Sequence, residues 1–299
     1  MIFLRIYFYI IISVGIWQGF MKKKFILNAD DFGMSKYYNQ AVYDGINNGI
    51  LTSASLCANG ECFEDAVNNI IPNCPDLSVG IHLNIIKGKS LTECPMLTDR
   101  TGNFNNGYIS LMFKSLNKDF MKQIEGEFRA QIEKILRHTK VDHIDSHVHT
   151  HAIPNIFKLT AKLANEYKIP YIRTQYEKPY LVPSFKKHLT TKYPPNILKI
   201  ILLNTFTILN KDTLKKYNLR TNDYLIGVGY TGMMDETTVE YGLKVLKKDC
   251  IAEALIHPCK YDNLKEDSHH FEYLITQNKQ LGQKINEELE FETVNHSYE

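Results

Sequence analysis

Several familiar signals are missing from this chain of 299 residues, and each absence argues against a class of function. The charges nearly cancel, with a formal net charge of +2, so nothing suggests general attraction to nucleic acid. None of the six cysteines forms a Cys-x-x-Cys pair, which argues against a zinc finger or a dithiol redox motif. A chain of this size needs no disulfides, so we expect reduced thiols. Neither an internal repeat nor a low-complexity tract is present.

Long apolar runs are also scarce. Residues 1–20 are almost entirely apolar and could form a signal anchor or short membrane span, but they show no clear small-residue cleavage site. Met21 and the three lysines after it are typical of the start of a soluble protein. We therefore expect residues 1–20 to be a dispensable extension or an anchor, and residues 21–299 to form a single cytoplasmic domain. A second run, Ile197 to Leu209, is too short to span a bilayer comfortably and predicts a core or lid helix.

From Met21 onward, strand-like and helix-like segments alternate. The predicted strands are 24–28, 52–58, 77–84, 141–145, 171–174, 224–228 and 251–256. The predicted helices are 38–46, 64–70, 120–136, 154–167, 239–246 and 268–287. Repeated strand–helix units predict an α/β fold with a mainly parallel sheet, and seven strands favour an irregular (β/α) barrel. The long segment 86–118 shows no clear period, and 176–222 is irregular.

Polar residues fall where the predicted strands end. They are Asp30 and Asp31 after the first strand, His82 at the third, His147 after the fourth, Arg173 at the fifth and His257 at the seventh. In a parallel barrel these points lie on one rim, where the active sites of barrel enzymes assemble. We therefore expect side chains far apart in sequence to converge there.

The residue types suit metal-dependent hydrolysis. Two adjacent carboxylates at the end of a buried strand call for a metal, a cation or a solvated site, although they could instead form a turn and helix cap before Ser35. An aspartate with two neutral imidazoles is a common catalytic set for a divalent ion. A neighbouring carboxylate can act as base, an arginine can keep that base ionised, and His257 could protonate a leaving group.

The segment around His147 contains three alternating histidines. In an extended chain His147, His149 and His151 would share one face. Not all need be ligands, and for His149 or His151 taken singly we expect a hydrogen-bonded structural role.

Four motifs together carry a family resemblance: NADDFGMS at 28–35, GIHLN at 80–84, DSHVHTH at 145–151 and HP at 257–258. In this order and at these separations, over about residues 22–290, the chain resembles the YdjC family of carbohydrate deacetylases, which includes chitooligosaccharide deacetylases. The resemblance implies an irregular (β/α) barrel that hydrolytically removes an N-acetyl group from an acetylated amino sugar or oligosaccharide.

The resemblance also implies roles for single residues. It makes Asp31, His82 and His147 the metal ligands, Asp30 the general base and His257 a candidate acid; Arg173 and Glu253 match family positions of less certain role. The family implies Mg²⁺, whereas the donor set suits Zn²⁺ or another transition ion at least as well. Residues 176–222 do not align with the family pattern and are expected to shape the sugar pocket.

Two other functions stay open. The His147-Val148-His149 pattern resembles the His-x-His of metal-dependent amidohydrolases and phosphoesterases, although there it commonly follows the first strand. A non-catalytic sugar-binding protein, tethered to the membrane through residues 1–20, would need the pocket but not the base. A homodimer is expected from frequency alone.

Overall fold

The computed structural model describes residues 23–183, 185–188, 190–191, 193–246, 249–261 and 268–298. The apolar segment 1–20 lies outside these ranges, so the alternatives of an anchor and a dispensable extension stay predictions. Within the described ranges, no helix combines the length and apolar character needed to cross a bilayer.

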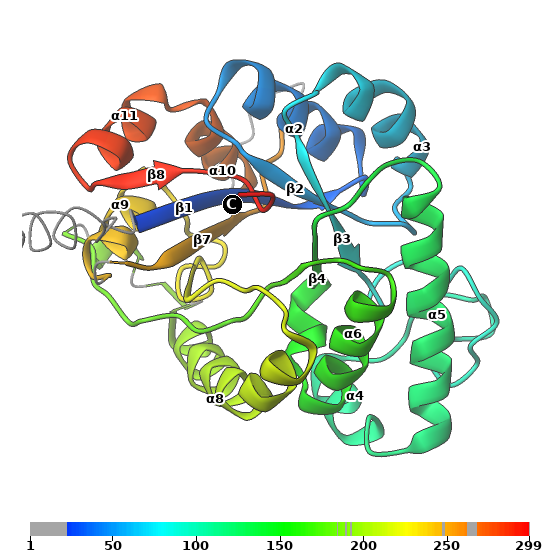
Figure 1. Cartoon of the computed structure of the whole chain (residues 1–299). Helices are drawn as coiled ribbons and strands as arrows, with labels where there is room; N and C mark the ends of the chain where they lie inside the picture. The colour runs from blue at the N-terminus through cyan, green and yellow to red at the C-terminus, as the bar shows by residue number, and fades with distance from the viewer. Residues whose placement is uncertain are drawn as a thin grey trace, which may run out of the picture.

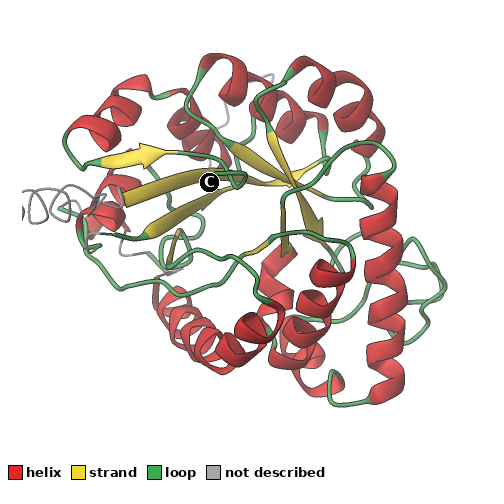
Figure 2. Cartoon of the chain, viewed as in Figure 1, coloured by secondary structure: helices red, strands yellow, loops and turns green. Residues whose placement is uncertain are grey.

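A parallel sheet forms the centre of the molecule (Figures 1 and 2). Its strands are β1 (Lys23–Phe32), β2 (Ser53–Leu56), β3 (Ser78–Leu83), β4 (His143–Ser146), β5 (Tyr171–Ile172), β6 (Tyr224–Ile226), β7 (Ile251–Ile256) and β8 (Phe291–Thr293). Seven of them follow the order β5-β4-β3-β2-β1-β7-β6, and β8 pairs with β1 outside this path. The predicted α/β class and seven-stranded parallel arrangement are confirmed; the short strand β8 was not predicted.

The sheet curls into an incomplete barrel. Among the described residues, the edge strands β5 and β6 share no ladder, but the chain beside them is joined by hydrogen bonds from Ile172 N to Arg220 O (3.0 Å) and from Leu225 N to Tyr176 O (2.8 Å). Helices lie around the outside in Figure 1. The α-helices are α2 (Lys36–Asn48), α3 (Phe63–Asp65), α4 (Tyr108–Lys114), α5 (Lys118–Leu136), α6 (Pro154–Glu166), α7 (Phe185–His188), α8 (Tyr193–Tyr217), α9 (Glu236–Lys244), α10 (Ser268–Gln277) and α11 (Lys279–Glu287). The other helical turns are η1 (Ala66–Ile70), η2 (Ile71–Asn73) and η3 (His147–Ala152).

Local sequence explains most of these elements. Ser35 caps α2 by accepting a hydrogen bond from Tyr38 N, as the predicted cap requires. Phe120, Ile124 and Phe128, from the apolar stripe of α5, are completely buried. Pro154 occupies the first turn of α6, where its missing N–H costs nothing.

Three predicted segments need correction. The segment 86–118 contains the helix α4, and the helix expected over Ile197 to Leu209 extends to Tyr193–Tyr217. The helix expected over 268–287 is divided at Asn278, whose side chain accepts a hydrogen bond from Leu281 N at 2.9 Å and caps α11. A capping side chain offers the backbone an alternative to continuing the helix, which the apolar periodicity alone does not reveal.

Polar and apolar residues occupy different compartments. The apolar core lies between the strands and the covering helices. Inside the curl, buried polar side chains from different strands meet one another instead: Asn28, Asp30, Ser55, His82, His143, Asp145, Tyr171, Arg173 and Glu253. A buried charge is tolerated only when it is paired, so this interior must be an organised network.

Candidate active site

A bulge in β1 brings the two adjacent aspartates into the same site. Ala29 pairs with Ala54 and Phe32 with Leu56, so three steps along β1 match two along β2. Asp31 takes up the extra residue with a left-handed backbone, at φ 64°. Consecutive side chains of a regular strand point to opposite faces, and a bulge re-aims them. Both carboxylates therefore reach polar partners inside the barrel.

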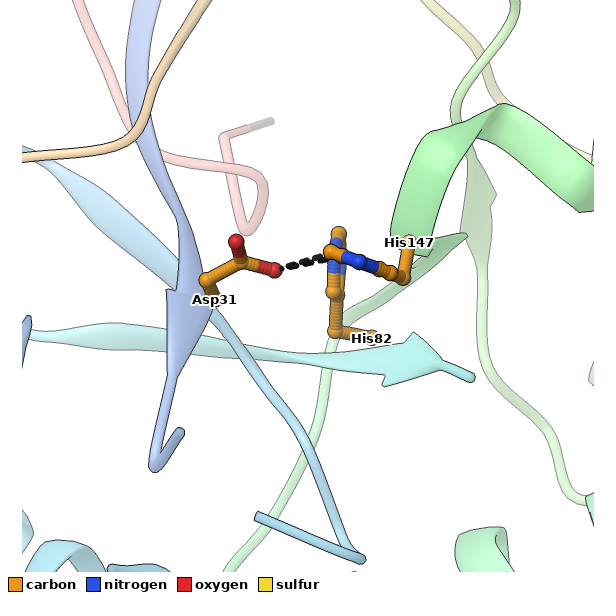
Figure 3. Close-up of side chains that lie close together, drawn as sticks. All are labelled: Asp31, His82 and His147. Atoms are coloured by element: carbon orange, nitrogen blue, oxygen red, sulfur yellow. Dashed lines mark hydrogen bonds and ion pairs between the residues drawn. The ribbon is translucent and has the colours of Figure 1, made fainter. Parts of the chain in front are cut away.

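Asp31 meets two histidines from other elements. Its Oδ1 lies 2.8 Å from His147 Nδ1 and 3.3 Å from His82 Nε2. Figure 3 shows the three side chains converging from β1, β3 and η3. One donor atom from each residue lies within 4.8 Å of the other two. The structure thus brings together the three residues predicted as metal ligands.

This group fits a divalent cation. His82 Nδ1 lies 2.6 Å from Asp145 Oδ1, whereas its buried Nε2 finds no hydrogen-bond partner among the described residues. A carboxylate on Nδ1 fixes the imidazole tautomer that leaves the Nε2 lone pair for a metal. One carboxylate and two imidazoles suit several divalent ions, so the donor set leaves the identity of the ion open.

The charge balance favours a cation as well. Three buried carboxylates, from Asp30, Asp145 and Glu253, surround the buried guanidinium of Arg173, and a fourth buried carboxylate, Asp31, lies against His147 and His82. Burial would raise the pKa of Asp31, but the hydrogen bond from His147 and the close contact with His82 hold that pKa well below its ordinary value. Burial would likewise lower the pKa of His82, but the neighbouring carboxylates, Asp145 first, raise it to about 10. The site thus attracts positive charge.

Arg173 organises the carboxylates behind this group. It follows β5 and is completely buried. Its Nη1 and Nη2 donate to the two oxygens of Asp30 at 2.8 Å each, its Nε donates to Glu253 at 2.6 Å, and its Nη2 lies 2.7 Å from Asp145 Oδ2. Burial would raise the pKa of Asp30, but the charge of Arg173 keeps it far below its ordinary value. Asp30 is therefore ionised and held in a fixed orientation.

His257 lies after β7 and is paired with Glu272 of α10. Its Nδ1 is 3.3 Å from Glu272 Oε2, which also accepts a hydrogen bond from the His257 backbone N–H. Burial would lower the pKa of His257, but Glu272, and then the charges of Asp31 and Asp30, raise it to about 9. A histidine with this pKa is protonated at neutral pH and can donate a proton.

The exposed fractions indicate where the site opens. The side chains of Asp31, His147 and His257 are 7%, 15% and 24% exposed, whereas that of Arg173 is completely buried. The side of the site formed by Asp31, His147 and His257 is thus the side that solvent reaches.

The prediction that His147, His149 and His151 share an extended face is wrong. They form the turn η3, in which Val148 and His149 have left-handed backbones at φ 54° and 56°. His151 is hydrogen-bonded through Nδ1 to Ser146 Oγ (2.6 Å) and through Nε2 to Arg173 O (3.0 Å), so its expected structural role is confirmed. In the described part of the chain His149 Nδ1 has no partner, and His149 is not in the group around Asp31. A His-x-His metal pair therefore does not describe this site.

Asn28, Ser55 and Asp145 also belong to the site, although the sequence did not predict them as members. Asn28 Nδ2 donates to Asp30 at 2.8 Å and to Ser55 Oγ at 2.9 Å, and Ser55 Oγ donates to Asp145 at 2.7 Å. The available signal was alternation, because Asn28 precedes Asp30 and His143 precedes Asp145 by two residues, with one apolar residue between each pair.

Comparison with known proteins gives consistent results. A family model described as "YdjC-like protein" matches residues 24–296. A protein of Brevibacillus brevis named carbohydrate deacetylase is 41% identical over 149 residues, which are 49% of this chain and 58% of the relative. A carbohydrate deacetylase of Geobacillus stearothermophilus is 34% identical over 55% of this chain and 65% of its own length.

Two further proteins are similar. A chitooligosaccharide deacetylase of Escherichia fergusonii is 34% identical over 49% of this chain and 57% of its own length. The chain thus spans less than two-thirds of the length of these curated relatives. A solved structure from Enterococcus faecalis V583, described as a candidate cellobiose-phosphate cleavage protein, has a TM-score of 0.68 and 22% identity over 92% of this chain and 98% of that one. This likeness shows a shared fold.

Proposed function

The chain belongs to the YdjC-like protein family, and from this premise we propose that it is a metal-dependent carbohydrate deacetylase. It would hydrolyse the acetamide of an N-acetylated amino sugar or chitooligosaccharide and release acetate. The observation that carries the proposal is the convergence of Asp31, His82 and His147 beside the ionised carboxylate of Asp30. The names of the relatives supply the substrate class.

In this proposal Asp31 Oδ1, His82 Nε2 and His147 Nδ1 hold the cation. Mg²⁺ is the ion suggested by the family, and Zn²⁺ or another transition ion is the alternative suggested by the imidazole ligands. A divalent ion held there would lower the pKa of a water molecule and polarise the acetamide carbonyl.

The other residues handle protons. As a water oxygen bonds to the carbonyl carbon, Asp30 takes one proton of that water at a carboxylate oxygen. Arg173 keeps Asp30 ionised and aimed, although the same pairing makes Asp30 a weaker base. His257, held by Glu272, gives its proton to the nitrogen as the carbon–nitrogen bond breaks. The products are acetate and a free amino sugar.

The test is acetate release by purified protein that has been stripped of metal. Samples resupplied separately with Mg²⁺, Zn²⁺, Mn²⁺ and Co²⁺ would be incubated with N,N′-diacetylchitobiose and related acetylated sugars. We expect no turnover after stripping and recovery with at least one ion. Full activity without any ion would refute the metal-dependent mechanism.

We also propose that residues 21–299 form one folding unit. The support is the pairing of Lys23 with Phe291, which joins the first and last strands of the sheet. The pairing of β1 with β8 cannot form until both of these strands are present. The cytoplasmic location and the homodimer stay predictions.

A further inference from the structure

A series of hydrogen bonds connects the opposite end of the barrel with the candidate metal ligand His82. Asp142 Oδ1 lies 2.6 Å from His143 Nδ1, and His143 Nε2 lies 3.1 Å from Ser55 Oγ. Ser55 Oγ donates to Asp145 Oδ2 at 2.7 Å, and Asp145 Oδ1 lies 2.6 Å from His82 Nδ1. We call Asp142, His143, Ser55 and Asp145 the floor chain, because it begins where β4 begins.

The imidazole of His143 is clamped in position. On one side the ring of His296 stacks on it with centroids 3.6 Å apart and planes 17° apart. On another side is Gly80 of β3, where an added Cβ would lie 2.0 Å from His143 Nε2. Position 80 must therefore lack a side chain for the ring to lie there. The position of this ring is thus determined by two separate elements.

The end of the barrel where β4 begins does not offer a good second metal site. Asp142, His143 and His296 lie close enough to hold an ion. However, each imidazole binds an ion in its own plane, and two nearly parallel stacked rings cannot direct lone pairs at one point. Both nitrogens of His143 are also already engaged, by Asp142 and by Ser55. The arrangement suits a positioning role better than ion binding.

Asp145 is the member of the floor chain that contacts His82. Its Oδ2 accepts a hydrogen bond from Ser55 Oγ and also lies 2.7 Å from Arg173 Nη2. Its Oδ1 faces His82 Nδ1. Two contacts on Oδ2 fix the plane of the carboxylate and therefore the direction of Oδ1. A carboxylate held in this way keeps the proton on Nδ1 of the ligand histidine and turns Nε2 toward the metal.

We propose that Ser55 and His143 are positioning residues of the metal centre, which act through Asp145 to fix the tautomer and ring orientation of His82. This inference rests on the proposed function, because it assumes that His82 binds a cation. Neither residue touches the substrate in this view. Their loss should change metal affinity more than it changes folding.

Co²⁺ titration of the metal-stripped protein tests the proposal, with visible absorption reporting the coordination geometry. We expect Ser55→Ala to bind Co²⁺ about 10-fold more weakly than the wild type, the lower end of the range for residues that support a ligand. The matched control is Ser78→Ala, which also removes a buried strand hydroxyl from an aspartate, Asp142 (2.8 and 2.9 Å), but leaves the path from His143 to Asp145 complete. Ser78→Ala should bind Co²⁺ like the wild type.

Substitutions at His143 add a rescue test. His143→Leu should weaken Co²⁺ binding as Ser55→Ala does, whereas His143→Gln, whose amide can reach Ser55, should restore most of the affinity. Ser55→Cys serves if Ser55→Ala does not fold, and thermal melting monitors folding in every variant. Equal Co²⁺ affinity in the wild type, Ser55→Ala and His143→Leu would overturn the proposal and indicate that Arg173 alone holds Asp145.

A second measurement separates this inference from the proposed function. In the metal-free protein the short bond between His82 and Asp145 should give a low-field imidazole proton resonance, identified by its loss in His82→Gln. We expect Ser55→Ala to shift or broaden it and Ser78→Ala to leave it unchanged. If the wild type binds no Co²⁺ but the resonance responds in this way, the metal centre is refuted and the positioning of His82 stands. An unmoved resonance in Ser55→Ala refutes the positioning role whatever the metal result.

Discussion

Both carboxylate oxygens of Asp30 are bound by the guanidinium of Arg173, at 2.8 Å each. This fork fixes the plane of the carboxylate and keeps its charge in a completely buried environment. A carboxylate held in this way is ionised at every ordinary pH, but it is a weaker proton acceptor than a free aspartate.

The substitution Asp30→Asn tests its assignment as base. An amide keeps the size of the side chain but cannot take a proton, so we expect kcat to fall by about 10²- to 10⁴-fold. Metal content, measured by atomic emission, should stay near the wild-type value, since Asp30 is not in the group around Asp31. Wild-type acetate release by this variant would contradict the assignment.

Removal of Arg173 should destabilise the fold. In Arg173→Met the carboxylates of Asp30, Asp145 and Glu253 lose their common partner, and breaking a buried pair from one side costs about 3–5 kcal/mol. The control is Arg129→Met, whose arginine pairs with Glu125 and Glu166 at the surface and is worth about 1 kcal/mol or less. Urea denaturation would measure both losses. Equal losses would mean that the buried cluster contributes no more than a surface pair.

The predicted ligands can be distinguished from other buried histidines by metal content. His82→Ala and His147→Ala should each lose the ion, because each removes one of the three converging donors. His151→Ala is the matched control: it removes an imidazole as buried as that of His82, and one that is already hydrogen-bonded to Ser146 and Arg173. It should lower stability and keep the metal. If His147→Ala retains the metal, His147 is not a metal ligand.

The pKa of His257 gives the expected pH dependence. With a pKa raised from 6.5 to about 9, the imidazolium can act as acid at neutral pH, and kcat should fall as pH rises through about 9. The same shift stabilises the fold: the contribution is complete below pH 6.5 and is lost as pH rises toward 9. Glu272→Gln removes the partner that raises this pKa most, so the alkaline limb of the rate profile should move to lower pH. If the alkaline limb of the rate profile does not move, His257 is not the group that donates the proton.

The left-handed backbone of Val148 predicts a stabilising substitution. A β-branched residue at φ 54° is strained, whereas asparagine adopts this region readily. Val148 is 40% exposed, so little packing is lost on its replacement. Val148→Asn should raise the free energy of unfolding by about 0.5–1 kcal/mol, and Val148→Ile should not. Chemical denaturation of the two variants compares them directly; equal stability would mean that the turn carries no strain.

The sequence predicted the strands and the residues at their carboxyl ends better than the side-chain contacts inside the barrel. Apolar runs and their polar ends located the seven strands and the positions of Asp31, His82 and His147, because parallel strands bring their ends to one edge. The partners of these residues were harder to identify. Ser55 and Asp145 become meaningful only when β2, β3 and β4 are adjacent, and strand order is not a local property of the sequence.

Other errors have a similarly physical origin. The turn η3 depends on left-handed backbones at Val148 and His149, which intrinsic preferences argue against and which only the surrounding fold can impose. Strand β8 is three residues long and is stabilised by pairing with the first strand rather than by its own composition. Neither feature has a periodic pattern to reveal it.

The irregular pairing of β1 with β2 also limits how the protein can be improved. A designer seeking a more stable sheet would delete the extra residue near Asp31 and obtain an unbroken ladder. Because alternate positions face opposite ways, that repair would direct one of the two acids into the apolar layer beneath the helices. At this point in the fold, an unbroken β1–β2 ladder and two aspartates inside the barrel cannot exist together.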